Sequence, residues 1–115
     1  LVGFSISIFI GINENRVTFC SLRVISGSQE GQIFLLDQNK FYIGYDFKND
    51  FILNDYAEVG NSHAIFLKND KEVFIENLYP ENETLVNFRS IDHLQSIKKG
   101  DIIKIGTALL QYYEN

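Results

Sequence analysis

Cysteine, alanine and basic residues are scarce in this 115-residue chain, and each scarcity excludes a class of protein. Cys20 is the only cysteine, so no internal disulfide can form, and its place in an apolar run predicts a small buried side chain rather than a reactive thiol. Alanine occurs only three times, so no segment has the composition that long helices favour. Ile, Phe and Tyr are plentiful instead, and these residues favour strands.

The charge balance argues against a nucleic-acid partner. Ten basic residues face fifteen acidic ones, which gives a formal net charge of −5. Nucleic-acid binding needs a basic surface that displaces counterions. The only adjacent pair of cations is Lys98-Lys99, which we expect in a solvated turn.

Groups suited to catalysis or metal binding are also few. The two histidines, His63 and His93, lie far from each other and from Cys20, so they give no metal-ligand spacing. His63 precedes an apolar strand, which predicts a buried, hydrogen-bonded residue rather than a catalytic base. No paired carboxylates, nucleophile motif or phosphate-cradling loop is present. We therefore predict that the chain is not an enzyme and holds no metal or cofactor.

Short strand signals separated by turn residues run through the whole sequence. We expect strands over residues 4–12, 16–26, 32–36, 40–44, 51–53, 63–67, 72–76, 84–87, 93–97, 101–105 and 109–113. Many short strands joined by loops predict an all-β sandwich or barrel. In such folds the loops at one end usually carry function, and the longest loops are residues 45–50, 54–62 and 77–83.

The first residues form an apolar stretch that is too short to cross a bilayer, which takes about 20 residues. Apolar residues alternate from Phe4 to Ile12, and a period of two predicts a strand. We assign residues 1–20 to an N-terminal strand or hairpin extension that follows a membrane segment or another domain. Residues 21–115 then form the main domain.

Five motifs follow one another in the loops and the strands beside them. They are Ile43-Gly44, Asn49-Asp50-Phe51-Ile52-Leu53, Gly60-Asn61-Ser62-His63-Ala64, Asn82-Glu83-Thr84-Leu85-Val86-Asn87 and Gly100-Asp101-Ile102-Ile103-Lys104-Ile105-Gly106. In order and spacing they resemble the motifs of the forkhead-associated (FHA) domain over residues 22–113. The resemblance implies a β-sandwich of about eleven strands, whose end loops read phosphothreonine peptides through charge-assisted hydrogen bonds.

The residues that grip phosphate in that family are replaced in this chain. Tyr45 stands at the position of the phosphate-binding Arg, Gly60 at that of the phosphate-binding Ser, and Asn61 at that of a second Arg. Glu83 replaces the Gly of an Asn-Gly pair. Phosphate carries nearly two negative charges and needs cations or converging donors, yet Lys48 is the only cation in the three loops. We expect most phosphate affinity to be lost.

Other positions match the family. Gly44 is expected at a tight turn, and the resemblance implies that His63 braces the loops. The candidate peptide-binding residues are Tyr45, Lys48, Gly60, Asn61, Ser62, Asn82, Glu83 and Thr84. Tyr45, Phe47 and Tyr56 lie in the same loops, where they either pack the loops or form an apolar recognition patch.

These features predict a non-catalytic protein–protein interaction module of a larger bacterial protein, independent of phosphate. FHA-like domains with degenerate motifs occur on the cytoplasmic side of membrane-anchored assemblies, including the inner rings of secretion systems. The resemblance thus implies a cytoplasmic domain that meets the membrane only through a segment outside this chain. The alternatives are a phosphothreonine-peptide reader that uses Lys48, Asn61 and Ser62, and a structural domain that oligomerises through residues 4–12.

Overall fold

Eleven strands make up the fold in the computed structural model, which describes residues 19–70 and 72–114. They are β1 (Cys20–Val24), β2 (Ile33–Leu35), β3 (Lys40–Gly44), β4 (Phe51–Ile52), β5 (Ala64–Lys68), β6 (Val73–Asn77), β7 (Thr84–Val86), β8 (Arg89–Ser90), β9 (Gln95–Ile97), β10 (Ile102–Ile105) and β11 (Ala108–Glu114). The strand expected over residues 4–12, and with it the N-terminal extension, lies outside the described residues.

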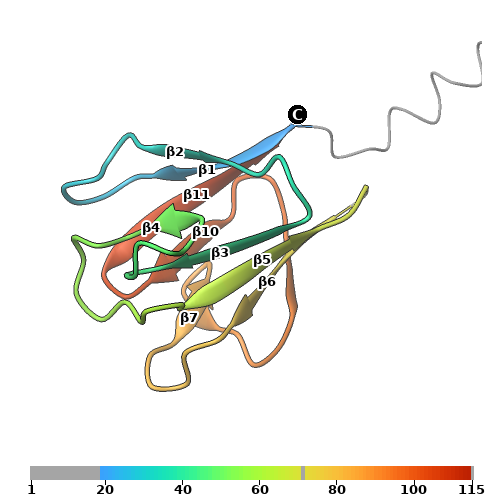
Figure 1. Cartoon of the computed structure of the whole chain (residues 1–115). Helices are drawn as coiled ribbons and strands as arrows, with labels where there is room; N and C mark the ends of the chain where they lie inside the picture. The colour runs from blue at the N-terminus through green and yellow to red at the C-terminus, as the bar shows by residue number, and fades with distance from the viewer. Residues whose placement is uncertain (1–18, 71, 115) are drawn as a thin grey trace, which may run out of the picture.

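The strands form two sheets that face each other (Figure 1). One sheet has six strands in the order β2-β1-β11-β10-β7-β8, and the other has five in the order β4-β3-β5-β6-β9. Strands β3 and β4 are parallel, whereas every other pair of neighbours is antiparallel. The expected all-β sandwich of eleven strands is confirmed.

Alternation of apolar and polar residues explains why most strands form where the sequence predicts them. In β11, Leu110 and Tyr112 are fully buried, whereas Gln111 between them is not. Ile103 and Ile105 of β10 alternate in the same way and face the same core. Side chains two residues apart share one face of a strand, so these residues cover the inner face of the six-stranded sheet.

Strand β8 was not predicted, because both of its residues are exposed and show no alternation. It is the return arm of a two-residue hairpin from β7, in which Val86 pairs with Arg89. The two turn residues, Asn87 and Phe88, have φ angles of 52° and 66°. Two successive positive φ angles define the turn whose twist matches that of the strands it joins. Turn geometry rather than hydrophobic pattern therefore creates β8.

Three stacked phenylalanines connect the two sheets through the core. Phe51 of β4 stacks on Phe34 of β2 with ring centroids 4.6 Å apart, and on Phe41 of β3 with centroids 4.9 Å apart. Phe34 belongs to the six-stranded sheet and the other two to the five-stranded sheet. All three are buried. The edge strand β4 is thereby anchored just after the loop of residues 45–50.

The loops 45–50, 54–62 and 77–83 meet at one end of the sandwich. The amide of Tyr45 donates to the carbonyl of Gly60 (2.9 Å), and the amide of Leu78 donates to the carbonyl of His63 (2.8 Å). The side-chain amide of Asn82 donates to the carbonyl of Glu58 (3.0 Å). Within residues 19–70 and 72–114, the structure contains no helix long and apolar enough to cross a membrane.

The phenylalanine stack can be tested with Phe51→Ala. Loss of a buried ring between two others leaves a cavity, and we expect the free energy of unfolding to fall by about 3–5 kcal/mol in urea denaturation. Phe47→Ala is the matched control, because Phe47 is 85% exposed and its loss should change the same quantity by less than about 0.5 kcal/mol. Equal effects of the two substitutions would contradict the assigned role of the stack.

Candidate functional site

The site begins where β3 ends, at Gly44, because the following loop runs directly against another backbone segment. The amides of Tyr45 and Asp46 donate to the carbonyls of Gly60 and Asn61, at 2.9 and 3.2 Å. A Cβ atom on Gly44 would lie 2.4 Å from the carbonyl oxygen of Asn61. Only glycine permits this approach, which aligns the first two loops.

Asn49 connects the same two loops through its side chain. It is 7% exposed, and its Nδ2 donates to the carbonyls of Asp46 (2.7 Å) and Asn61. Its Oδ1 accepts a hydrogen bond from the hydroxyl of Ser62 at 3.0 Å. The hydroxyl of Ser62 is therefore engaged inside the protein. The role of Asn49 could not be predicted, because sequence alone does not show which loop amide is buried.

His63 is fully buried, and both of its ring nitrogens are hydrogen-bonded. Nδ1 lies 3.0 Å from the backbone nitrogen of Gly60, and Nε2 lies 3.2 Å from the carbonyl oxygen of Glu83. A backbone N–H can only donate, so Nδ1 is the acceptor and Nε2 carries the proton. Burial lowers the pKa of His63 and outweighs the hydrogen bond to Glu83, which acts in the opposite direction. His63 is thus a neutral brace between two loops.

The ring of Tyr79 lies directly on Gly60. A Cβ atom on Gly60 would lie 2.4 to 2.7 Å from three atoms of that ring. The ring centroid of Tyr79 lies 5.6 Å from that of His63. Gly60 therefore has no room for a side chain. Sequence reasoning missed Tyr79, because nothing in the pattern indicates that it packs on a residue nineteen positions earlier.

Polar side chains in the third loop bond to the protein itself. Nδ2 of Asn77 donates to the carbonyls of Tyr79 and Asn82, at 3.1 and 3.3 Å. Thr84 is fully buried, and its hydroxyl donates to Oδ1 of Asn77 at 2.7 Å. The side-chain amide of Asn82 donates a hydrogen bond to the backbone carbonyl of Glu58. Asn82 and Thr84 were predicted to contact peptide, and here their side-chain hydrogen bonds hold the loop.

Two aromatic side chains of the first loop face solvent. Tyr45 is 51% exposed and Phe47 is 85% exposed, and both line a depression of about 410 Å³ together with Asn54 and Asn61. Tyr56 differs, because its hydroxyl donates to the carbonyl of Ser26 and accepts from the amide of Gln29. Tyr56 therefore packs between the loops, as one of the two alternatives predicted. Tyr45 and Phe47 are exposed at the surface instead.

The charge of the three loops is strongly negative. Lys48 is their only cation, and it is exposed. The carboxylates of these loops belong to Asp46, Asp50, Asp55, Glu58, Glu81 and Glu83. Among the residues that the structure describes, no group of three His, Cys, Asp or Glu side chains could hold a metal ion. This end of the sandwich therefore presents two exposed aromatic rings among acidic side chains.

The fold and the braced end loops define an FHA-like domain, and comparison with protein families agrees. A family described as the cytoplasmic domain of the inner membrane component of the type III secretion system matches residues 23–115. The chain belongs to this bacterial, non-catalytic family, and the domain is cytoplasmic. No curated protein matched the chain in sequence.

Solved structures show the same fold. The FHA domain of the CT664 protein from Chlamydia trachomatis is 28% identical with a TM-score of 0.76, over 84% of this chain and 98% of that one. An FHA domain of an Arabidopsis thaliana hypothetical protein is 21% identical with a TM-score of 0.77, over 99% and 93%. The FHA domain of FhaA, in complex with the intracellular domain of Rv3910, is 22% identical with a TM-score of 0.73, over 81% and 98%.

The neutral state of His63 makes stability depend on pH. The pKa of the histidine is about 6.5 in the unfolded chain and lower in the folded one. Between these two values the unfolded chain therefore binds more protons. We expect the free energy of unfolding to fall as the pH drops below about 6.5, and His63→Gln to remove that part of the dependence. His93→Gln is the control, because His93 is exposed. Identical pH profiles for the two variants, measured by urea denaturation, would be inconsistent with the buried neutral ring.

The contact between Tyr79 and Gly60 can be tested by a double-mutant cycle. Gly60→Ser forces a side chain into the Tyr79 ring, and we expect a loss of about 1–3 kcal/mol in the free energy of unfolding. The same substitution in a Tyr79→Ala background should cost less, because the space is then free. Thermal and urea unfolding of the four proteins measure the coupling. Additive effects would show that the ring does not occupy this position.

Proposed function

We propose that this domain is a protein-interaction module that binds its partner without phosphate, through the exposed end of the three loops. The proposal concerns the mode of recognition at the cytoplasmic face of a type III secretion system. The observation that carries it is the Tyr79 ring on Gly60, which fills the position where a phosphate-binding side chain would project.

Electrostatics support the absence of phosphate recognition. A bound phosphate needs positive charge or several converging donors in a partly dry site. Here Lys48 is outnumbered by carboxylates, His63 is neutral and buried, and the hydroxyls of Ser62 and Thr84 are bonded internally. A phosphorylated peptide would therefore meet net repulsion without a compensating fork of hydrogen bonds.

Tyr45 and Phe47 supply the surface that replaces the phosphate site. Exposed aromatic side chains beside a depression are typical anchors of protein interfaces, because they bury large apolar areas at little cost in conformational entropy. The loop that carries them is fixed by Gly44 and Asn49, so its aromatic residues are presented in one geometry. The FHA domain of FhaA, which has the same fold, forms a complex with an intracellular domain of another protein.

The second candidate is a phosphothreonine reader with an atypical site. It is favoured by one observation: Asn61 and Lys48 are both exposed on the loops beside the depression, where they could meet a peptide. This candidate requires affinity that falls steeply with salt and is lost in Lys48→Ala. Self-association through residues 4–12 concerns a segment outside the described residues and stays a prediction from sequence.

Calorimetric titration separates the two candidates. The domain is titrated with a degenerate phosphothreonine peptide library and with its unphosphorylated twin. We expect no difference between the two libraries, because Lys48 is the only cation of the three loops and the hydroxyl of Ser62 is bonded to Asn49. Micromolar binding that requires the phosphate and disappears in Lys48→Ala would overturn the proposal.

Capture from the lysate of the source bacterium tests the aromatic surface. We expect the protein partner to be retained equally from phosphatase-treated and untreated lysate, and retention to fall in a Tyr45→Ser, Phe47→Ser double variant. Ile33→Ser is the control, because Ile33 is an exposed apolar residue on strand β2, outside the three end loops. Loss of the partner after phosphatase treatment, or equal loss in the control, would contradict recognition by Tyr45 and Phe47.

A further inference from the structure

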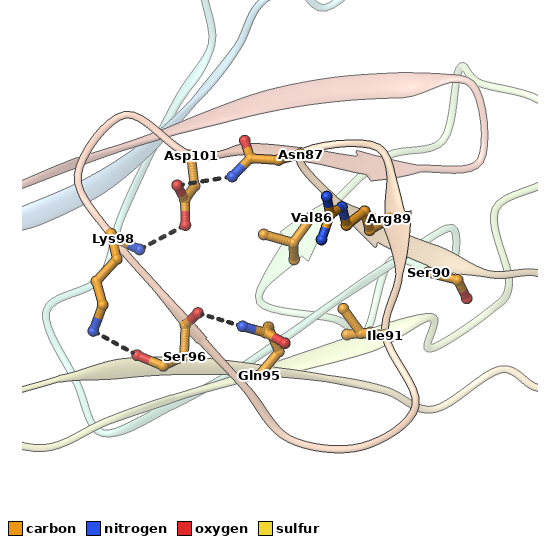
Figure 2. A pocket seen from close by; sticks show the side chains of 9 residues that line it. All are labelled: Val86, Asn87, Arg89, Ser90, Ile91, Gln95, Ser96, Lys98 and Asp101. Carbon is orange, nitrogen blue, oxygen red and sulfur yellow. Dashed lines mark hydrogen bonds between the residues drawn. The ribbon is translucent and has the colours of Figure 1, made fainter.

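A second hollow lies along the side of the sandwich, away from the end loops. It has a volume of about 680 Å³ and lies between β8, the last strand of the six-stranded sheet, and β9, the last strand of the five-stranded sheet (Figure 2). None of its lining residues belongs to the loops 45–50, 54–62 or 77–83. The two surfaces are therefore separate parts of the molecule.

Arg89 brings a positive charge to this hollow. Figure 2 shows its guanidinium near Val86, the residue with which Arg89 pairs across the hairpin, and within the described residues this group has no hydrogen bond or ion pair. The carboxylate in the lining, Asp101, is already satisfied: its Oδ1 accepts from Nδ2 of Asn87 (3.0 Å), and its Oδ2 accepts from the amide of Lys98 (2.8 Å). Among the described residues, no carboxylate therefore compensates the charge of Arg89, although the chain carries a net charge of −5.

A second cation stands at the rim. The ammonium group of Lys98 donates to the hydroxyl of Ser96 at 3.1 Å and forms an ion pair of 3.5 Å with Glu72. That pair is exposed, so it is weak and can exchange for another carboxylate. The hollow therefore offers one unpaired guanidinium and one exchangeable ammonium to an anionic ligand.

Phe88 stands at the tip of the adjoining hairpin in a conformation that L-residues rarely adopt. Its φ angle is +66°, and its side chain is 62% exposed. Glycine would hold this turn without strain, whereas a bulky residue with positive φ is an outlier. In the isolated domain, Phe88 is therefore unfavourable for two reasons: its backbone is strained, and its apolar ring is exposed to water. Such an arrangement is understandable if the ring contacts a partner.

The backbone of β8 is also available. Among the strands that the structure describes, β8 has a neighbour only on the side of β7, and the amide of Ile91 donates to the carbonyl of Thr84 at 3.1 Å. In an antiparallel pair the backbone groups of successive residues point alternately toward the neighbour and away from it. The N–H and C=O of Ser90 therefore point off the edge of the sheet, where an extended chain could pair with them.

We infer that the β7–β8 hairpin and the hollow beside it form a second docking surface, which takes an extended acidic segment of another protein. A carboxylate of that segment pairs with Arg89, an apolar side chain packs on Phe88, and the backbone pairs with Ser90. The inference rests on the proposed function in that it assumes an interaction module. It uses a different face, however, so either proposal can fail without the other.

The test is an NMR titration of the ¹⁵N-labelled 115-residue chain with a ten-residue peptide that alternates Glu and Val. We expect shifts of the amides of Phe88, Ser90 and Ile91 that weaken with added salt, and little response to a peptide with Gln in place of Glu. Arg89→Glu should weaken binding about tenfold or more, because it replaces attraction by repulsion. Lys40→Glu is the matched charge reversal on the five-stranded sheet and should leave binding unchanged.

Phe88→Gly separates binding from folding. Glycine relieves the left-handed turn, so this variant should unfold at a higher temperature than the wild type and yet bind the Glu-Val peptide less tightly. A variant that is more stable and binds equally well would show that the ring has no role in docking. Equal shifts with the Gln peptide would show that Arg89 does not recognise carboxylate.

Two further outcomes would overturn the inference. Amide shifts confined to residues 45–62 would show that the acidic peptide binds at the end loops and not at the hairpin. An Arg89-dependent dimer in light scattering would make the occupant a second copy of this acidic chain rather than another protein. If the amides of the hairpin do not shift in the titration, but capture of the partner still depends on Tyr45 and Phe47, only this inference is wrong. If the hairpin responds while the Tyr45 and Phe47 variants behave as wild type, the proposed function of the end loops is wrong.

Discussion

The arrangement of the three end loops depends on the hydrogen bonds of one buried residue, His63. Its backbone donates to Ile43 and accepts from Leu78, its Nδ1 accepts from Gly60, and its Nε2 donates to Glu83. The residue therefore holds the end of β3 and the second and third loops in one arrangement. Because the imidazole is fully buried, each lost bond would leave a polar group without water, and the loops are fixed together rather than one by one.

This brace explains how the domain can keep an FHA-like scaffold while its surface changes. The residues that hold the loops point inward, as Gly44, Asn49 and His63 do, and they set the backbone independently of any ligand. Only the exposed side chains, such as those of Tyr45, Phe47 and Lys48, project from that backbone and can be exchanged at little cost to stability. Tyr45 and Phe47 illustrate the second kind of residue: both side chains are exposed, while the backbone of their loop is held from within. Stability and recognition are thus carried by different atoms of the same loops.

The fold was predictable from sequence because it depends on alternation, which is a local property. The alternation of buried residues such as Ile103, Ile105 and Leu110 predicts strands β10 and β11. The order of the five motifs indicated the sandwich. The site was predictable only in part. Tyr79 packs on a residue distant in sequence, Asn49 acts through burial, and β8 arises from a turn, so none of these produces a periodic signal. Loop positions could be located from sequence, but the direction of their side chains depends on contacts between loops.

The pairing of the first and last strands has a mechanical consequence. Cys20 of β1 lies opposite Glu114 of β11, so the chain enters and leaves the sandwich at one corner (Figure 1). Tension applied between these two points pulls the strands apart from one end and opens their hydrogen bonds one pair at a time, as a zipper opens. That geometry resists force far less than sliding the strands past each other, where all pairs would have to break together. Under tension between these two points, the β1–β11 pair would therefore be the first part of the sandwich to separate.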